Sequence, residues 1–318
     1  MVKFTVGVKR MVRPALIRLK KFLVRIISHY RARIVQIMHI LSAALLLSSI
    51  AFFFIYEVFY ILPNYLDASG CAYKFNWLLL LYLLHNILGN ILYCWGTDTS
   101  FVALPKDRQQ PLATEAHLWH LCTHCNMLVP PRTFHCRVCN CCILKRDHHC
   151  NFLANCIGHV NQRYFVALLL HLTLGCAIAL IYNVLYLWEQ RGAVLSNPNE
   201  FVGVCLGFHP LHLTMSREAL FNNELNWLIF NCCILKLNAI ALMLAGALLI
   251  IQLFMISRAS CMHAIRDRSY DLGFSFNMRQ VLGKRMLWTM LSPMVRSQLP
   301  QDGTRWQQPL DNEAKKPA

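Results

Sequence analysis

Eight cysteines lie between Cys122 and Cys156, together with His135, His148 and His149, at spacings suited to metal and thiol chemistry. Paired Cys-x2-Cys spacings in a basic segment indicate zinc rather than disulfides, and hence a reducing compartment. A structural zinc takes four Cys or His ligands in a tetrahedron. Two such sites need about eight ligands, so the segment predicts two zinc ions with soft ligands to spare.

The order of the ligands limits how they are shared. Side chains of neighbouring residues seldom converge on one ion, so we expect His135 and Cys136 to serve different sites. The two predicted Cys3His sites are interleaved along the chain: Cys122, Cys125, His135 and Cys142 form one, and Cys136, Cys139, His149 and Cys156 form the other. The groups left over are Cys141, His148 and Cys150. Because every metal position is filled, both zinc ions are expected to be structural.

Composition places this cluster in a membrane protein. Of 318 residues 56% are hydrophobic, which is too high for an ordinary soluble domain. Four apolar runs approach the roughly 20 residues that a helix needs to cross a bilayer, near 36–58, 75–95, 164–187 and 237–256. The fourth is ambiguous at its start, because 225–235 is also apolar and Lys236 interrupts the run. The expected fold is an all-α polytopic membrane protein with four transmembrane helices.

The distribution of the net charge of +16 predicts the orientation. Lys and Arg are frequent at the N-terminus, in the loop 96–163 and at the C-terminus, and rare in the other loops. By the positive-inside rule both termini and the cysteine-rich zinc domain between helices 2 and 3 are cytosolic. The predicted regions are a basic N-terminus (1–35), helices 1 and 2 (36–95), the zinc domain (96–163), helices 3 and 4 with a lumenal loop (164–257) and a cytosolic C-terminal segment (258–318).

The basic N-terminus allows two interpretations. Residues 14–30 form a candidate amphipathic helix, expected to lie on anionic lipid. A mitochondrial presequence is also Arg-rich and acid-poor, but a polytopic chain with a cytosolic zinc domain argues against it. Nucleic acid is not an expected partner, because no helix with free base-reading positions separates the zinc ligands. Residues 298–318 are polar and contain three prolines, which predicts a disordered tail.

The segment as a whole resembles the DHHC family of protein S-acyltransferases (palmitoyltransferases). The resemblance covers about forty-five residues at the family's spacing and extends to the four-span layout. It is carried by Cys122, Pro130, Arg132, His135, Cys136, Asp147-His148-His149-Cys150, Cys156, Asn161 and Phe165. The family's ligand sets correspond to the two assigned above. The resemblance makes Cys150 the nucleophile, while Cys141 is expected to be a packing residue.

A thiol attacks only as thiolate, so Cys150 needs a base or a nearby positive charge. His148 is expected to be that base, with Asp147 fixing its tautomer and stabilising the imidazolium. Two alternatives stay open at this point. Asp147 and His148 could instead support a zinc ligand, and Cys150 could be a spare thiol.

The expected reaction is a ping-pong transfer of a fatty acyl group from acyl-CoA, such as palmitoyl-CoA, through acyl-Cys150 to a cysteine of a membrane-associated protein. The acyl tail would stay within the bilayer, with Phe152, Phe165, Leu168 and Gly175 as candidate tunnel residues. Candidate cations for the CoA phosphates are Arg132, Arg137, Lys145, Arg146 and Arg163. The family default places the protein in the endoplasmic reticulum or Golgi membrane.

Some family motifs are altered here, as expected for a short, divergent member without ankyrin repeats. Asp-Pro-Gly after the second span is Asp98-Thr99-Ser100, and Pro-Trp after the nucleophile is Asn151-Phe152. Thr-Thr-x-Glu after the fourth span is Ala259-Ser260-Cys261-Met262, in which the Ser260 hydroxyl is expected to bond Asp147. The C-terminal aromatic and asparagine motif resembles the stretch from Tyr270 to Gly283, including Asn277. The alternative function is a weak or inactive zinc-containing membrane scaffold.

Overall fold

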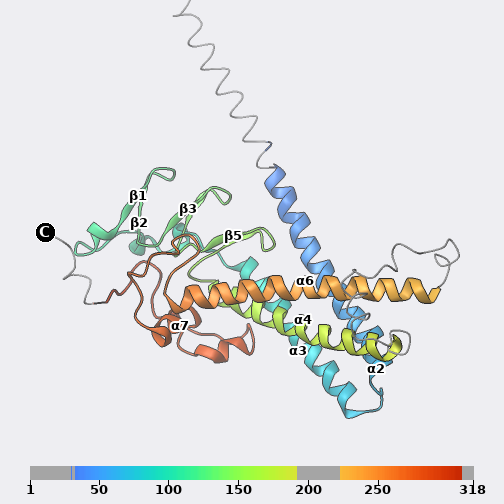
Figure 1. Cartoon of the computed structure of the whole chain (residues 1–318). Coiled ribbons are helices and arrows are strands. Elements are labelled where there is room, and N and C mark those ends of the chain that lie inside the picture. The colour runs from blue at the N-terminus through green and yellow to red at the C-terminus, as the bar shows by residue number, and fades with distance from the viewer. Residues whose placement is uncertain (1–29, 31–32, 192–222, 310–318) are drawn as a thin grey trace, which may run out of the picture.

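The computed structural model describes residue 30 and residues 33–191 and 223–309 (Figure 1). Within these residues, four helices are long and apolar enough to cross a membrane: Arg33–Tyr65, Cys71–Gly96, Gln162–Glu189 and Trp227–Ser257. The prediction of four membrane helices is therefore confirmed. The predicted amphipathic helix 14–30 lies outside the described residues except for its last residue, and 310–318 lie outside them too.

The second, third and fourth spans belong to the long helices α3 (Cys71–Gly96), α4 (Gln162–Arg191) and α6 (Asn223–Ser257). Helix α4 packs along both α6 and α3 (Figure 1). The first span ends in the π-helical segment η1 (Glu57–Ile61) and the short helix α2 (Leu62–Tyr65). Lys236 lies inside α6, so the apolar stretch 225–235 is part of the fourth helix, which settles the ambiguous start.

Polar side chains join the spans where they would otherwise face lipid. Asn183 of α4 donates a hydrogen bond to Glu57 of the first span. The Tyr182 hydroxyl donates to Asn76 Oδ1 of α3 at 3.0 Å. Inside a membrane such groups find no water, so pairing between helices satisfies them and fixes the helix contacts.

The cysteine-rich region between α3 and α4 is built from three two-stranded antiparallel hairpins. Their strands are β1 (His120–Cys122) with β2 (Met127–Val129), β3 (Phe134–Cys136) with β4 (Cys141–Ile143), and β5 (His148–Cys150) with β6 (Asn155–Ile157). The all-α expectation is wrong for this region. Its turns contain Asn126, Asn140 and Ala154 at φ 50°, 54° and 46°, the left-handed conformation that reverses a chain sharply and that asparagine tolerates well.

After α6 the chain forms helix α7 (Phe274–Leu282) and then returns to the transmembrane helices and the hairpins. The Tyr82 hydroxyl of α3 donates to the carbonyl of Leu291 at 2.9 Å. Farther on, Arg163 donates to the carbonyl of Ser297 at 2.7 Å, and the His159 ring lies 2.9 Å from the carbonyl of Gln301. The prediction of a disordered tail is therefore wrong for residues 298–309, which lie against the cysteine-rich region.

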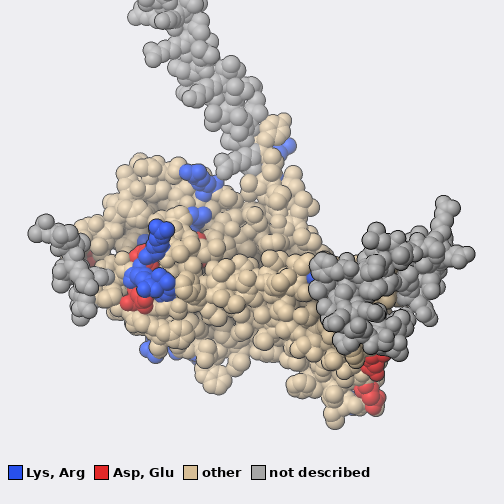
Figure 2. Space-filling model, viewed as in Figure 1, with Lys and Arg blue, Asp and Glu red and all other residues tan. Residues whose placement is uncertain are grey.

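Charged side chains are unevenly spread over the surface. On the face shown in Figure 2, the described Lys and Arg residues gather mainly at the end that holds the hairpins and the C-terminal segment, while the flank of the long helices is nearly free of charge. An uncharged flank of this kind is what a bilayer core requires. The charged cysteine-rich end therefore lies outside the apolar layer.

Candidate active site and metal centres

The structure brings together the two ligand sets that the sequence predicts. In each set the four candidate ligand atoms lie within 4.8 Å of one another: Cys122, Cys125, His135 and Cys142 in the first, and Cys136, Cys139, His149 and Cys156 in the second. The Cys139 and Cys156 sulfurs lie 3.3 and 3.5 Å from His149 Nδ1. A tetrahedral zinc with bonds of about 2.3 Å to sulfur separates its ligand atoms by about 3.8 Å, so both sets fit this ion.

The hairpin register explains why the two sets interleave. His135 of β3 lies opposite Cys142 of β4, and His149 of β5 lies opposite Cys156 of β6. Each such cross-strand pair meets the Cys-x2-Cys turn of the preceding hairpin. The second hairpin therefore gives its strands to one site and its turn, with Cys136 and Cys139, to the other.

Cys150 occupies the repeat position that belongs to neither ligand set. Cys122, Cys136 and Cys150 each end the first strand of a hairpin. The first two face the strand pair of a following hairpin, but β5–β6 is followed by helix α4. Cys150 packs instead against an apolar cluster from all four membrane helices and the third hairpin, which includes Ile91, Leu153 and Leu168.

His148 and Cys150 share one face of β5, while His149 between them points to the metal set, as strand alternation requires. Asp147 is buried, and its Oδ2 lies 2.8 Å from His148 Nδ1. Burial alone would lower the pKa of His148, but hydrogen bonds with Asp147 and Cys150 and their charges raise it to about 9. Burial raises the pKa of Asp147, but the hydrogen bond and charge of His148, together with the hydrogen bonds from Met262 and Gln252, outweigh it, so the net shift is downward. Asp147 and His148 therefore form a hydrogen-bonded carboxylate–imidazole pair next to Cys150, an arrangement that favours the protonated ring.

Comparison with known proteins decides what this arrangement belongs to. The family model described as DHHC palmitoyltransferase matches residues 115–267. The protein named probable palmitoyltransferase ZDHHC24 from Rattus norvegicus is 33% identical over 234 residues, 72% of this chain and 77% of that protein. The chain belongs to the DHHC palmitoyltransferase family.

Two further relatives agree. The protein of the same name from Homo sapiens is 32% identical over 195 residues, 61% of this chain and 66% of that protein. Palmitoyltransferase ERF2 from Candida glabrata is 48% identical over 66 residues, 21% of this chain and 20% of that protein. The DHHC protein described here is therefore a protein-cysteine S-palmitoyltransferase.

The candidate tunnel residues of this DHHC protein differ in burial and in whether they lie next to Cys150. Phe165 and Leu168 are buried in the cluster next to Cys150, and the Phe165 ring lies edge-on to His148 with centroids 5.1 Å apart. Phe152 is half exposed, outside this cluster. Gly175 lies two turns beyond Leu168 on α4, and a Cβ there would meet nothing within 4 Å.

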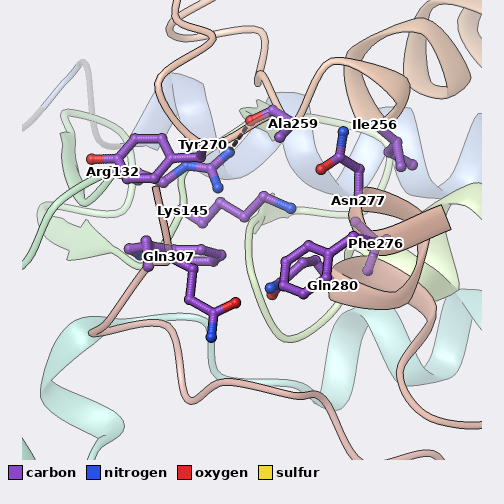
Figure 3. A pocket seen from close by; sticks show the side chains of 11 residues that line it. Arg132, Lys145, Ile256, Ala259, Tyr270, Phe276, Asn277, Gln280 and Gln307 are labelled. Atoms are coloured by element: carbon purple, nitrogen blue, oxygen red, sulfur yellow. Dashed lines mark hydrogen bonds between the residues drawn. The ribbon is translucent and has the colours of Figure 1, made fainter. Parts of the chain in front are cut away.

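The five candidate cations for the CoA phosphates fall into a buried group and a group that is at least partly exposed. Arg132 and Lys145 are buried and line a cavity of about 10 Å³ beneath the C-terminal segment (Figure 3). The Arg132 guanidinium lies 4.8 Å from the Tyr270 ring centroid and 4.4 Å from that of Trp306. Both cations are therefore too enclosed to meet a ligand at the surface. Arg137, which is exposed, and Arg146 and Arg163, which are partly exposed, remain candidates.

The expected bond between Ser260 and Asp147 is absent. Ser260 Oγ donates to the carbonyl of Met255 at 3.3 Å, because Ala259 at φ 51° turns the chain back toward α6. Asp147 instead accepts from Gln252 Nε2 and from the Met262 backbone N–H, each at 2.7 Å. Sequence reasoning missed Gln252, although a glutamine inside an apolar span was the available signal.

The C-terminal motif has a structural role that fits the resemblance. Asn277 of α7 is buried and donates from Nδ2 to the carbonyl of Ser257 at 2.9 Å and to Asp271 Oδ1 at 2.8 Å. It thereby fixes α7 to the end of α6. Cys141 is in neither ligand set and is partly buried beside Cys136, as expected of a packing residue.

Proposed function

We propose that this palmitoyltransferase works through an acyl-enzyme at Cys150, with His148 as the base and Asp147 as the group that orients it. The observation that carries the proposal is the contact chain Asp147–His148–Cys150, placed where polar hairpins meet the apolar cluster of the spans. A thiolate next to an imidazolium is the activated form of a cysteine nucleophile.

In the first step the Cys150 thiolate attacks the carbonyl carbon of a fatty acyl-CoA. The bond from that carbon to the CoA sulfur breaks, and the leaving thiolate takes the proton that His148 holds. In the second step His148 removes the proton from a cysteine thiol of the protein substrate. That sulfur attacks the acyl carbon, the bond to Cys150 breaks, and the Cys150 thiolate is restored. One thioester replaces another in each step, so no further energy source is required.

The position of Cys150 suits a substrate whose tail cannot leave the membrane. Withdrawing an acyl chain into water costs about 0.8 kcal/mol per CH2, or on the order of ten kcal/mol for a sixteen-carbon chain. The apolar cluster around Cys150 includes residues of all four spans, among them Leu46, Ile91, Leu168 and Leu249. A tail lying among these helices would keep its thioester at the edge of the hairpins.

Two zinc ions are proposed for the two Cys3His sets, where they would cross-link the three hairpins and hold β5 in place. The CoA phosphates are proposed to contact Arg137, Arg146 and Arg163. The proposed orientation has the hairpins and both termini in the cytosol, in a membrane of the endoplasmic reticulum or Golgi, with the domain boundaries given by the sequence. The proposed substrates are cysteine-containing proteins at the same membrane.

Labelling with a clickable fatty acid tests the proposal. Wild-type protein should take up hydroxylamine-sensitive label that maps to Cys150, and Cys150→Ser should take up none there. Cys141→Ser is the matched control, because it removes a neighbouring thiol that is in neither ligand set. Label that persists in Cys150→Ser, or is absent from folded wild-type protein, would contradict the proposal and favour a scaffold that binds partners without turnover. A series of acyl-CoAs of different length would define the preferred donor.

A further inference from the structure

We infer that Gln252 is a positioning residue for the acyl transfer, and that it holds Asp147 as the last link of a buried hydrogen-bond chain that begins at Lys145. The inference rests on the proposed roles of Cys150, His148 and Asp147. It assigns a function to a residue of the fourth span that no motif marks.

The chain consists of consecutive side-chain hydrogen bonds between distant parts of the sequence. Lys145 Nζ donates to Gln162 Oε1 at 2.8 Å, Gln162 Nε2 donates to Gln252 Oε1 at 3.1 Å, and Gln252 Nε2 donates to Asp147 Oδ2 at 2.7 Å. Asp147 Oδ2 then lies 2.8 Å from His148 Nδ1. The hydrogen-bond chain therefore runs unbroken from the link between the second and third hairpins through α4 and α6 back to the orienting carboxylate.

The two ends fix the direction of every bond. An ionised carboxylate can only accept, and the Lys145 amino group has N–H to donate whether it is charged or neutral. Each glutamine must therefore present its oxygen toward Lys145 and its nitrogen toward Asp147. Rotating the Gln252 amide by half a turn would set its oxygen against the carboxylate and its nitrogen against that of Gln162. Each amide consequently has one orientation that satisfies both of its neighbours.

Burial makes the hydrogen-bond chain costly to break. Gln162 and Gln252 are each 1% exposed, Asp147 3% and Lys145 4%. A glutamine in an apolar span loses its hydration, which is recovered only if both ends of the amide are paired. Gln252 lies near the end of α6, at the level of the hairpins, where both partners are within reach. These two hydrogen-bond partners explain why a polar residue stands at position 252 of an apolar span.

Gln252 bonds the same carboxylate oxygen that faces His148. Asp147 Oδ1 is held separately by the Met262 backbone N–H. With both oxygens bonded, the carboxylate plane is fixed, and with it the direction in which the imidazole ring points. Without Gln252, Oδ2 would keep only His148, and the carboxylate could turn about its bond to Met262. The loss would fall on the alignment of His148 with Cys150 rather than on binding of acyl-CoA.

Single-turnover acylation of the purified full-length protein in lipid nanodiscs would test this role. Gln252→Met keeps the side-chain length and removes both hydrogen bonds. We expect the maximal rate constant of Cys150 acylation to fall about ten- to a hundredfold, the range that a hydrogen bond to a charged group supports. The palmitoyl-CoA concentration at half-maximal rate and the zinc content should stay as in wild type. Gln280→Met makes the same substitution at another buried glutamine. Gln280 lies on α7 and is not part of the hydrogen-bond chain, so this variant should leave the rate constant unchanged.

A double-mutant cycle separates positioning from packing. If Gln252 acts through Asp147, Gln252→Met should cause no further loss in an Asp147→Ala background. An unchanged rate constant in Gln252→Met, an equal loss in both backgrounds, or a loss matched by Gln280→Met would overturn the inference. Failure of the proposed function would be recognised separately, because the fatty-acid label would then persist in Cys150→Ser or be absent from folded wild-type protein.

Discussion

His39 of the first span and His149 of the third hairpin face each other, with their Nε2 atoms 2.9 Å apart. His149 turns Nδ1 toward the sulfurs of Cys136, Cys139 and Cys156. With zinc bound at Nδ1, the proton of the neutral ring would be on Nε2, and His149 would donate to His39 Nε2. This bond connects the first span directly to a predicted zinc ligand.

Replacing His39 should weaken the second metal site without touching a ligand. A hydrogen bond to the far nitrogen of a ligating histidine fixes its tautomer and orientation, and its loss typically costs about 10- to 100-fold in metal affinity. We expect His39→Leu to lose one zinc per chain at a lower chelator concentration than wild type, as followed with a colorimetric zinc indicator. His85→Leu changes a histidine on α3 that contacts only Ser292 among described hydrogen bonds, and it serves as the control. Equal zinc retention in both variants would show that the His39 contact is dispensable.

Removing zinc should abolish acylation even though Cys150 is in neither ligand set. The hairpins have strands of only three residues, and apparent binding free energies for structural zinc are about 10–16 kcal/mol. Stripping the metal should therefore release β5 and separate His148 from Cys150. We expect the fatty-acid label to fall with zinc content as chelator is raised, and Cys142→Ser to lose label and zinc together. Cys150→Ser should lose label while keeping both zinc ions, and full labelling of zinc-free protein would contradict this prediction.

Trp306 should stabilise the folded protein through the two buried cations. Its ring lies 4.4 Å from the Arg132 guanidinium carbon and 5.9 Å from Lys145 Nζ, and it packs edge-on against His159. A cation over an indole contributes about 0.5–2 kcal/mol, so losing the ring from both cations in Trp306→Ala should destabilise the protein by about 1–4 kcal/mol. Thermal unfolding in detergent would measure the loss. Trp306→Phe keeps a ring face and should retain most of the stability, whereas equal melting temperatures for Trp306→Ala and wild type would refute the contact's importance.

Lys145 should make stability depend on pH in a defined direction. Burial, and secondly the charge of Arg132, lowers the pKa of Lys145 from 10.5 to about 7. Between these values the unfolded chain binds a proton that the folded chain has released, so the Lys145 contribution to stability rises with pH. Below about pH 7 both states are protonated and the cost of burying the charge is present in full.

The measurable consequence is a difference between two melting curves. The melting temperature of Lys145→Met minus that of wild type should be greatest near pH 6 and should fall as the pH is raised toward 10. Arg137→Met provides the reference, because it removes an exposed cation whose charge is not buried on folding. A difference that is constant or rises with pH would show that Lys145 is charged throughout.

Much of the site could be predicted because its chemistry depends on local spacing. Side chains of neighbouring residues seldom converge on one ion, so His135 and Cys136 were assigned to different metal sets, and His148 and Cys150 were left outside both. The four membrane helices followed from hydropathy for a similar reason, since a bilayer demands about 20 apolar residues in a row. These rules act over a few residues and need no knowledge of the rest of the chain.

The errors involve contacts between segments far apart in the sequence. Ser260 was expected to bond Asp147, but a left-handed turn at Ala259 directs it to Met255, and Gln252 supplies the bond from inside the fourth span. Residues 298–309 were expected to be disordered, but Trp306 and its neighbours cover buried cations of the hairpins. The three hairpins of the cysteine-rich region also depart from the expected all-α fold class.

The sequence by itself determined the candidate ligand sets, the four spans and the protein family. The ligand sets and the family follow from residue spacing, and the spans follow from hydrophobic composition. Only the tertiary structure decided which groups surround Asp147, which cations are enclosed and why Cys150 lies outside both ligand sets. Cys150 ends a hairpin that has a helix after it instead of another strand pair, so its thiol meets the apolar ends of the membrane helices. That outcome depends on how α4 and α6 pack against the third hairpin, and such packing is set by long-range burial that no local pattern records.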